Sequence, residues 1–206
     1  MRRREAPRGV VDPCPAPGRH PHPVAVAIRR PAGRNPLSVS TLGELERLFT
    51  SLSARAGIRA VVFTGAADVF ASGANIRELS ALGPDAALAF ARRGQGLFQK
   101  IEDARPLTVA AVNGFCMGGG LDLALACRLR VASPGAVFAH PGARLGVITG
   151  WGGTQRLPRL VGSALACEMF LTARRLSAAE ALEAGLVSLV AEPALDAALR
   201  LAARHA

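Results

Sequence analysis

The chain has 206 residues, of which 50% are hydrophobic and 19% charged. This balance excludes an intrinsically disordered protein and fits one domain with a substantial core. The net charge of +10 is carried almost wholly by scattered arginines, and one tryptophan is accompanied by no tyrosine. Because nucleic-acid platforms combine clustered charge with aromatic residues, we expect no nucleic acid as partner and interpret the charge as aiding solubility and contacts to a small polyanion.

The four cysteines form neither a C-x-x-C pair nor the spacing of a metal site, so we expect reduced thiols, no metal and a cytoplasmic location. No run of eighteen apolar residues is present, and we expect no membrane span. Prolines rather than an apolar stretch follow the basic start, so no signal peptide is expected.

The first 23 residues are rich in proline and arginine, and we expect a flexible arm without regular structure before a domain over residues 24–206. The first half of this domain is expected to alternate strands and helices. The strands are expected at 24–28, 58–64 and 107–112, and the helices at about 40–54, 76–82 and 85–102. In the first helix, Thr41 and Glu44 have capping-box spacing.

The second half continues in the same way, which predicts the α/β class with mainly parallel pairing. Strands are expected at 129–132, 137–139 and 186–190, a glycine-rich loop at 140–153, and helices near 154–161, 164–171, 177–184 and 195–204. Ser177 and Glu180 have capping-box spacing, and Gly185 marks the end of that helix.

The stretch 109–126, VAAVNGFCMGGGLDLALA, organises the rest of the chain. It predicts a buried strand, a tight turn at Asn113-Gly114 and a helix that begins at Gly118-Gly119-Gly120. Glycines allow a ligand to approach the backbone closely, and the first amides of a helix have no partner within the helix. Such a helix start suits an oxyanion or a phosphate.

Two phosphate-binding motifs are excluded by the residues themselves. A P-loop requires lysine and then serine or threonine after its last glycine, where this chain has Leu121-Asp122. A dinucleotide fingerprint requires a glycine at the position of Leu123. Two interpretations stay open: an oxyanion hole with Asp122 beside it, or glycines that let the helix pack closely on the strand.

Six segments in order resemble the crotonase superfamily, the enoyl-CoA hydratase/isomerase group. They are Arg30-Pro31 with Asn35-Pro36-Leu37-Ser38, then residues 70–76, 111–120, 138–141, 151–157 and 184–187. The resemblance implies a crotonase-like (ClpP/crotonase) spiral of ββα units. It also implies an acyl-CoA substrate, no cofactor beyond the coenzyme A that the substrate carries, and a homo-oligomer, either trimer or hexamer.

The resemblance implies a role for each matched site residue. The backbone N–H groups of Ala74 and Gly119 correspond to the pair that holds the thioester oxygen, and losing one such donor typically costs ~10²–10³ in rate. Asp122 stands where hydratases have their first catalytic glutamate, so we expect it to be the acid/base. The implied substrate-binding residues are Arg34, Asn35, Pro36, Asn75, Ile76, Arg77, Gly118, His140, Gly142, Gly150 and Trp151.

Some of these roles have alternatives. Arg34 and Arg77 either meet the phosphates of coenzyme A or are solvated surface arginines. Trp151 either borders the acyl pocket or packs in the core. His140 either replaces the second base or is a structural variant.

The chain departs from the family at Gly142, which stands where hydratases have their second glutamate. Hydration by a carboxylate pair is therefore not expected, and Asp122 alone favours isomerase-like proton transfer. Decarboxylation, thioester hydrolysis and acyl-CoA binding without catalysis are the alternatives. Family members usually continue into several further helices, so we expect a shortened C-terminal helical region and an open pocket.

Overall fold

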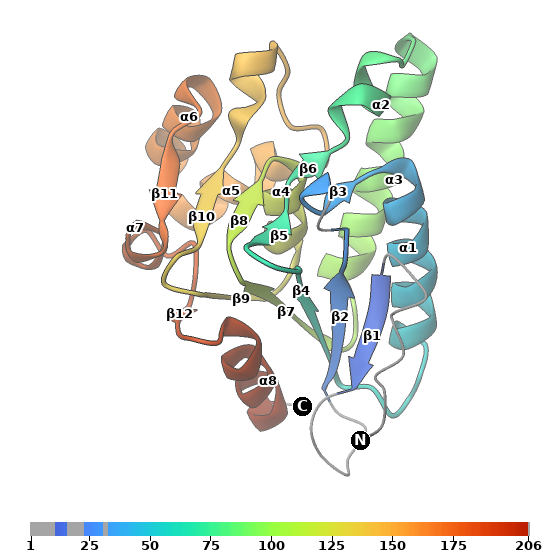
Figure 1. Ribbon diagram of the computed structural model, residues 1–206, viewed down its shortest axis with the longest axis vertical. Helices are drawn as coiled ribbons and strands as arrows, with labels where there is room; N and C mark the ends of the chain where they lie inside the picture. Colours follow the sequence, from blue (N-terminus) through green and yellow to red (C-terminus); the bar gives the residue numbers. More distant parts are fainter. Residues whose placement is uncertain (1–10, 16–22, 31–32, 206) are drawn as a thin grey trace.

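The structure, a computed structural model, describes residues 11–15, 23–30 and 33–205. Its largest unit is a six-stranded sheet in the order β1-β2-β4-β7-β9-β12 (Figure 1). The strands are β1 (Val11–Pro15), β2 (Val24–Ile28), β4 (Ala60–Thr64), β7 (Leu107–Val112), β9 (Leu129–Ala132) and β12 (Leu189–Val190). Only β1 pairs antiparallel to its neighbour within this sheet. The mainly parallel α/β architecture confirms the predicted fold class.

Two smaller sheets continue the spiral. A four-stranded sheet has the order β11-β10-β8-β5, and a third sheet pairs β3 with β6. The strands are β3 (Pro36–Leu37), β5 (Val69–Ala71), β6 (Gly73–Ala74), β8 (Phe115–Met117), β10 (Val137–Ala139) and β11 (Arg175–Ser177). Because β7 belongs to the large sheet and β8 to the small one, the Asn113-Gly114 turn carries the chain from one sheet to the other.

Eight α-helices are assigned among the described residues. They are α1 (Val39–Ser53), α2 (Ile76–Ser80), α3 (Pro84–Glu102), α4 (Gly119–Ala126), α5 (Gly153–Val161), α6 (Ser163–Thr172), α7 (Ala178–Glu183) and α8 (Ala194–His205). A 3-10 helix spans Pro141–Leu145. No described helix has the length and apolarity that crossing a membrane requires. Among the described residues, no three histidine, cysteine or acidic side chains are placed to hold a metal ion.

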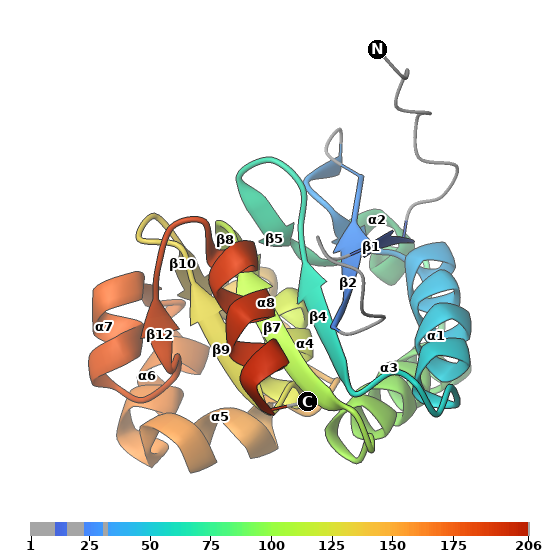
Figure 2. The same cartoon turned by 90° about the horizontal axis from the view of Figure 1, so that it is seen from below.

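The central strands bury both faces, which explains their continuous apolar runs. Alternate residues of β4 and β7 contribute to two separate cores: Val61, Phe63, Ala110 and Val112 to one, and their neighbours Val62 and Val109 to the other. The first core contains residues of α1, α3 and α4. In the second core α8 lies across β4, β7 and β9 (Figure 2).

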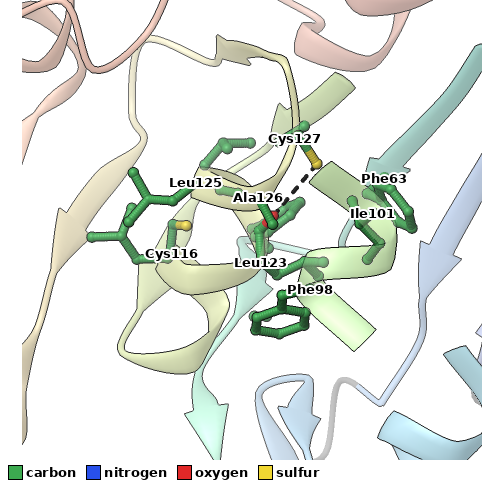
Figure 3. Packing of buried hydrophobic residues seen from close by; sticks show 14 of the residues in the cluster. Phe63, Phe98, Ile101, Cys116, Leu123, Leu125, Ala126 and Cys127 are labelled. Atoms are coloured by element: carbon green, nitrogen blue, oxygen red, sulfur yellow. Dashed lines mark hydrogen bonds between the residues drawn. The ribbon is translucent and has the colours of Figure 1, made fainter. Parts of the chain in front are cut away.

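Helix α4 is buried on every side from Gly120 to Ala126, so apart from Asp122 it is apolar all round rather than amphipathic. Figure 3 shows its residues packed against Phe98 and Ile101 of α3 and Phe63 of β4. The Cys127 thiol at its end donates to the Leu123 carbonyl at 3.4 Å. Cys116 and Cys127 are buried free thiols, whereas Cys167 is an exposed one.

The structure differs from the sequence expectations at several elements. Val11–Pro15 forms β1 instead of part of an unstructured arm, and its prolines are tolerated because β1 is an edge strand. Residues 1–10 and 16–22 of that expected arm lie outside the described residues. The cap of α1 is Ser38 and not Thr41, whose amide donates to the Ser38 hydroxyl. The capping box of Ser177 and Glu180 is confirmed.

Candidate active site

The start of α4 and strand β6 meet at backbone contact. A Cβ atom added to Gly73 would lie 2.9 Å from the Gly119 nitrogen and 2.8 Å from the Met117 carbonyl oxygen, so the position tolerates only glycine. Gly118 has a φ of 52° and a ψ of −121°, a conformation that other residues rarely adopt. These glycines bring Ala74 and Gly119, the two expected oxyanion donors, to the wall of one cavity.

This cavity has a volume of about 290 Å³ and a largely apolar wall. It is lined by Ser72, Gly73, Ala74, Ile76, Leu79, Ala87, Phe90, Ala91, Gly118, Gly119, His140, Pro141, Gly142, Leu145, Val147, Ile148, Thr149, Gly150 and Trp151. His140 is the one titratable side chain in that set. Helix α2 and the segment after β10 supply part of the wall, and both rise from the same end of the molecule in Figure 1. Ile76 and Ile148 are more than half exposed.

Trp151 lies on the wall of this cavity and also packs in the core, and its contact with an acyl group stays a prediction. Its ring makes edge contacts with Phe90 and Phe98, at centroid distances of 5.2 and 5.6 Å. A Cβ added to Gly94 of α3 or to Gly119 of α4 would overlap the indole. The tryptophan therefore fills the space that these two glycines leave between the helices.

Asp122 lies in the first turn of α4 and is fully buried, behind the wall rather than on it. The Thr149 hydroxyl donates to its Oδ2 atom. Burial raises the pKa of Asp122 to about 7, against the opposing effects of the Thr149 hydroxyl, the nearby Trp151 backbone and the charge of Arg156. Asp122 thus changes charge near neutral pH.

His140 follows β10 and faces Asp122 from the neighbouring strand. Its Nε2 atom lies 3.5 Å from Asp122 Oδ1, and its ring lies 4.9 Å from that of Phe170. Burial lowers the pKa of His140 to about 4. Asp122 Oδ1 and both ring nitrogens of His140 have no hydrogen-bond partner among the described residues. Such buried orphan atoms are rare in proteins and often mark functional sites.

Arg156 of α5 holds the Trp151 loop in place through hydrogen bonds, and the sequence did not predict it as a site residue. Its guanidinium donates to Glu102 of α3 at 2.6 and 2.9 Å, and to the Trp151 carbonyl at 3.1 Å. Gln95 of α3 donates to the Gly150 carbonyl at 2.7 Å. These residues line a second, more polar cavity of about 450 Å³ on the other side of Trp151. Arg156 belongs to the matched segment 151–157, but nothing in the sequence distinguishes it from Arg159, the other arginine of α5.

Asn35 and Asn75 make structural hydrogen bonds, and their expected roles in substrate binding stay predictions. The buried Asn35 side chain accepts from the Arg30 amide and donates to the Val69 and Ala66 carbonyls. Pro36, in β3, pairs with Gly73. Asn75 caps α2 by accepting from the Arg77 amide.

Arg34 and Arg77 are exposed and lie outside the cavity wall. The Arg34 guanidinium lies 4.9 Å from the centroid of the Phe115 ring. Gly142 is on the wall, but a Cβ added there would lie 2.5 Å from the Val147 carbonyl oxygen. The loop therefore leaves no room for the glutamate that hydratases carry at this position.

Comparison with known proteins agrees with this geometry. The family model described as enoyl-CoA hydratase/isomerase matches residues 23–205. The chain is 39% identical over 169 residues to the short-chain-enoyl-CoA hydratase of Clostridium acetobutylicum, covering 82% of this chain and 65% of that one. It is 40% identical over 167 residues to the crotonyl-CoA hydratase of Syntrophomonas wolfei, covering 81% and 64%. The chain thus spans slightly less than two thirds of the length of these relatives.

Solved structures give the same result. An enoyl-CoA hydratase from Bacillus anthracis superposes with a TM-score of 0.88 at 33% identity, covering 95% of this chain and 76% of that one. Pseudomonas aeruginosa DspI superposes with a TM-score of 0.87 at 36% identity, covering 95% and 79%. The chain therefore belongs to the enoyl-CoA hydratase/isomerase family and has the crotonase fold.

Proposed function

We propose that this protein acts on acyl-CoA thioesters by stabilising an enolate, with the Ala74 and Gly119 amides as the oxyanion hole and Asp122 as the acid/base. The observation that carries the proposal is the meeting of β6 and the start of α4 on one apolar cavity that has a buried carboxyl group behind it. Reduced buried thiols and an acyl-CoA substrate support a cytoplasmic enzyme. Coenzyme A arrives with the substrate, and no separate cofactor takes part.

The chemistry follows from where charge develops. Breaking the C–H bond next to the thioester carbonyl moves its electron pair into an enolate, whose oxygen gains negative charge. Two preorganised amides, one at the positive end of a helix, stabilise that oxygen more than the neutral carbonyl. A carboxyl group whose pKa lies near 7 is suited to take up a proton and return it at neutral pH.

Double-bond isomerisation fits the site better than hydration does. In isomerisation of a 3-enoyl thioester, a proton leaves C2, the electron pair shifts through the enolate, and the proton returns at C4. Hydration needs in addition a second group that activates water, and the Val147 carbonyl occupies the side-chain direction of Gly142. The small apolar cavity favours a short acyl chain.

The proposal extends to the rest of the substrate and to assembly. Arg34 and Arg77 are proposed to meet the coenzyme A phosphates from outside the cavity, since both residues are exposed and the stacking of Arg34 on Phe115 leaves its N–H groups at the ring's edge for an anion. Exposed apolar residues at the cavity mouth, including Ile76 and Ile148, support a homo-oligomer that covers them, a trimer or hexamer.

The test supplies the purified protein with trans-3-hexenoyl-CoA and with crotonyl-CoA, with Asp122→Ala as the comparison. We expect conversion of the 3-enoyl thioester to the conjugated 2-enoyl thioester, slow or no hydration of crotonyl-CoA, and loss of turnover in Asp122→Ala. If wild type turns over neither substrate, the proposed reaction is wrong.

Decarboxylation is the second candidate, favoured by the position of Asp122 behind the cavity wall. Loss of carbon dioxide from a malonyl-type thioester supplies the electron pair of the enolate without a base. Release of carbon dioxide from methylmalonyl-CoA, undiminished in Asp122→Ala, would select this reaction.

Two further outcomes would point to other functions. Release of free coenzyme A would indicate a thioester hydrolase. Tight binding of acyl-CoA without turnover would indicate a non-catalytic binding protein.

A further inference from the structure

We infer that Asp122 and His140 form a proton relay, in which His140 exchanges a proton with the substrate at the cavity and Asp122 stores it. The inference rests on the proposed function and adds a second residue to it. It makes His140 the group next to the reacting carbon and Asp122 the group behind it.

The first support is the position of the two side chains. Asp122 is buried and absent from the cavity wall, whereas His140 is the one titratable residue on the wall. Asp122 Oδ2 is already engaged by the Thr149 hydroxyl, and Oδ1 faces His140 Nε2 at 3.5 Å. Thr149 and His140 are the two wall residues beside the carboxylate. We assign the relay to His140, because an imidazole can accept a proton at one nitrogen while it releases another from the second.

The second support is the set of orphan polar atoms. Asp122 Oδ1 and both nitrogens of His140 are buried without a hydrogen-bond partner. Leaving such groups unpaired in the interior destabilises the fold, and a proton shared between Oδ1 and Nε2 pairs two of them. The pair has two forms of this kind. Either the carboxylate accepts from Nε2–H and Nδ1 is bare, or the carboxyl O–H donates to Nε2 and Nδ1 carries the hydrogen.

The two forms differ by one proton, and this is the step of the relay. A substrate C–H bond breaks, its electron pair enters the enolate, and the proton bonds to Nδ1. In the same step the Nε2–H proton passes to Asp122 Oδ1. The imidazole ends neutral, and return of the proton to C4 reverses both transfers. No charged imidazole forms in this buried position.

The surroundings keep the imidazole neutral and let the carboxyl change charge. Burial lowers the pKa of His140 to about 4 and raises that of Asp122 to about 7, the reverse of their usual order. The groups facing the pair are Thr149, the Phe170 ring of α6, Arg156 of α5 and the Cys116 thiol of β8. Arg156 favours the carboxylate, and burial keeps the Cys116 thiol protonated by raising its pKa.

The first test needs no substrate, so it separates this inference from the proposed function. The free energy of unfolding is measured from pH 4 to 7 in wild type, Asp122→Asn and His140→Gln. Between pH 4 and 6.5 the folded pair holds its proton on Asp122, whose ordinary pKa is 3.8, while the unfolded chain holds it on His140, whose ordinary pKa is 6.5. The folded and unfolded states therefore bind the same number of protons, so this pair does not make the free energy of unfolding of wild type depend on pH in this range.

Each variant removes one titrating group of the pair, so the titration of the other group becomes visible in the stability. In Asp122→Asn only the unfolded state is protonated, at His140. As pH rises, the folding constant therefore rises relative to wild type by up to about tenfold per pH unit. In His140→Gln only the folded state is protonated, at Asp122. As pH rises, the folding constant therefore falls relative to wild type by a similar factor. Parallel curves in all three proteins would overturn the inference. If a variant does not fold, wild-type NMR decides: Asp122 Cγ must titrate near pH 7 and the His140 ring must stay neutral at pH 5.5.

The second test uses acyl-CoA. We expect His140→Gln to lose at least about 100-fold in exchange of the α-hydrogen of butyryl-CoA with deuterium oxide while binding of butyryl-CoA is kept. Added imidazole should restore part of the rate in His140→Ala. Thr149→Val is the control: a larger loss in this variant than in His140→Gln would place the proton path through the hydroxyl and overturn the relay. Inactive wild type with the expected pH curves would overturn only the proposed function.

Discussion

Gly119 has the Trp151 ring directly over its Cα atom, so even one methyl group at this position displaces the ring or the turn. We predict that Gly119→Ala lowers turnover of the 3-enoyl thioester by about 10²–10³, because the amide no longer points at the developing oxyanion. Initial rates and near-ultraviolet circular dichroism of the tryptophan measure both effects. Gly135→Ala is the control, since a Cβ there meets nothing within 4 Å, and it should leave the rate unchanged.

Gly142 stands where hydratases have a glutamate, yet its side-chain direction ends 2.5 Å from the Val147 carbonyl oxygen. We predict that Gly142→Glu does not create hydratase activity and destabilises the fold by about 1–3 kcal/mol, because the loop must move. Hydration of crotonyl-CoA and urea unfolding measure these outcomes. Gly135→Glu, in an exposed turn, should change stability little. Efficient hydration by Gly142→Glu would show that the loop conformation does not limit the reaction.

The sequence identified most of the candidate site but not how its members touch. Asp122, Gly119 and Ala74 came from the resemblance, and their common location depends on backbone contacts between segments over forty residues apart. Thr149 was not singled out, because a threonine within a glycine-rich loop has no pattern that reveals a carboxylate partner. Only the register of β10 beside β8 brings His140 to Asp122.

At the scale of elements, helix α3 contains two glycines two positions apart with opposite surroundings. Gly94 is buried against the Trp151 indole, whereas Gly96 is exposed and a Cβ there meets nothing within 4 Å. We predict that Gly96→Ala stabilises the protein by about 0.5–1 kcal/mol, since alanine favours helix. Gly94→Ala should destabilise it by about 1–3 kcal/mol through overpacking. Thermal unfolding of both variants tests this, and equal shifts would contradict it.

Element boundaries were predicted well wherever an apolar run ends at proline or glycine. The strands at 24–28, 107–112, 129–132 and 137–139 match the structure residue for residue. The short strands β3, β5, β6, β8 and β11 were missed, because two or three residues show no periodicity unless a turn marks them, as Pro134-Gly135 does before β10. Arg130 was also missed as a structural residue: it is buried and donates to the carbonyls of Cys127 and Leu186, which ties the end of α4 to the chain before β12.

At the scale of the whole molecule, the six-stranded sheet has a core on each face, and α8 supplies the helical side of one of them. The helix contacts the sheet through small side chains, Ala194, Ala197, Ala198 and Ala202, which let its backbone approach closely. This sheet face therefore depends on one helix for its cover among the described residues, and its stability is concentrated in that contact.

We predict that Ala198→Asp destabilises the whole protein by more than about 3 kcal/mol, because it places an unpaired carboxylate against Val62 and Val109. The matched control is Ala203→Asp on the exposed side of the same helix, which should change stability by less than about 0.5 kcal/mol. Urea unfolding measures both. A mild effect of Ala198→Asp would mean that α8 leaves the sheet without loss of the fold.

The indole of Trp151 has a practical consequence, since it is the only one in the chain and lies on the cavity wall beside Gly119. Its fluorescence therefore reports on whatever ligand enters this cavity, without a label. Emission from this single fluorophore allows titration of a ligand and timing of its arrival in the same experiment.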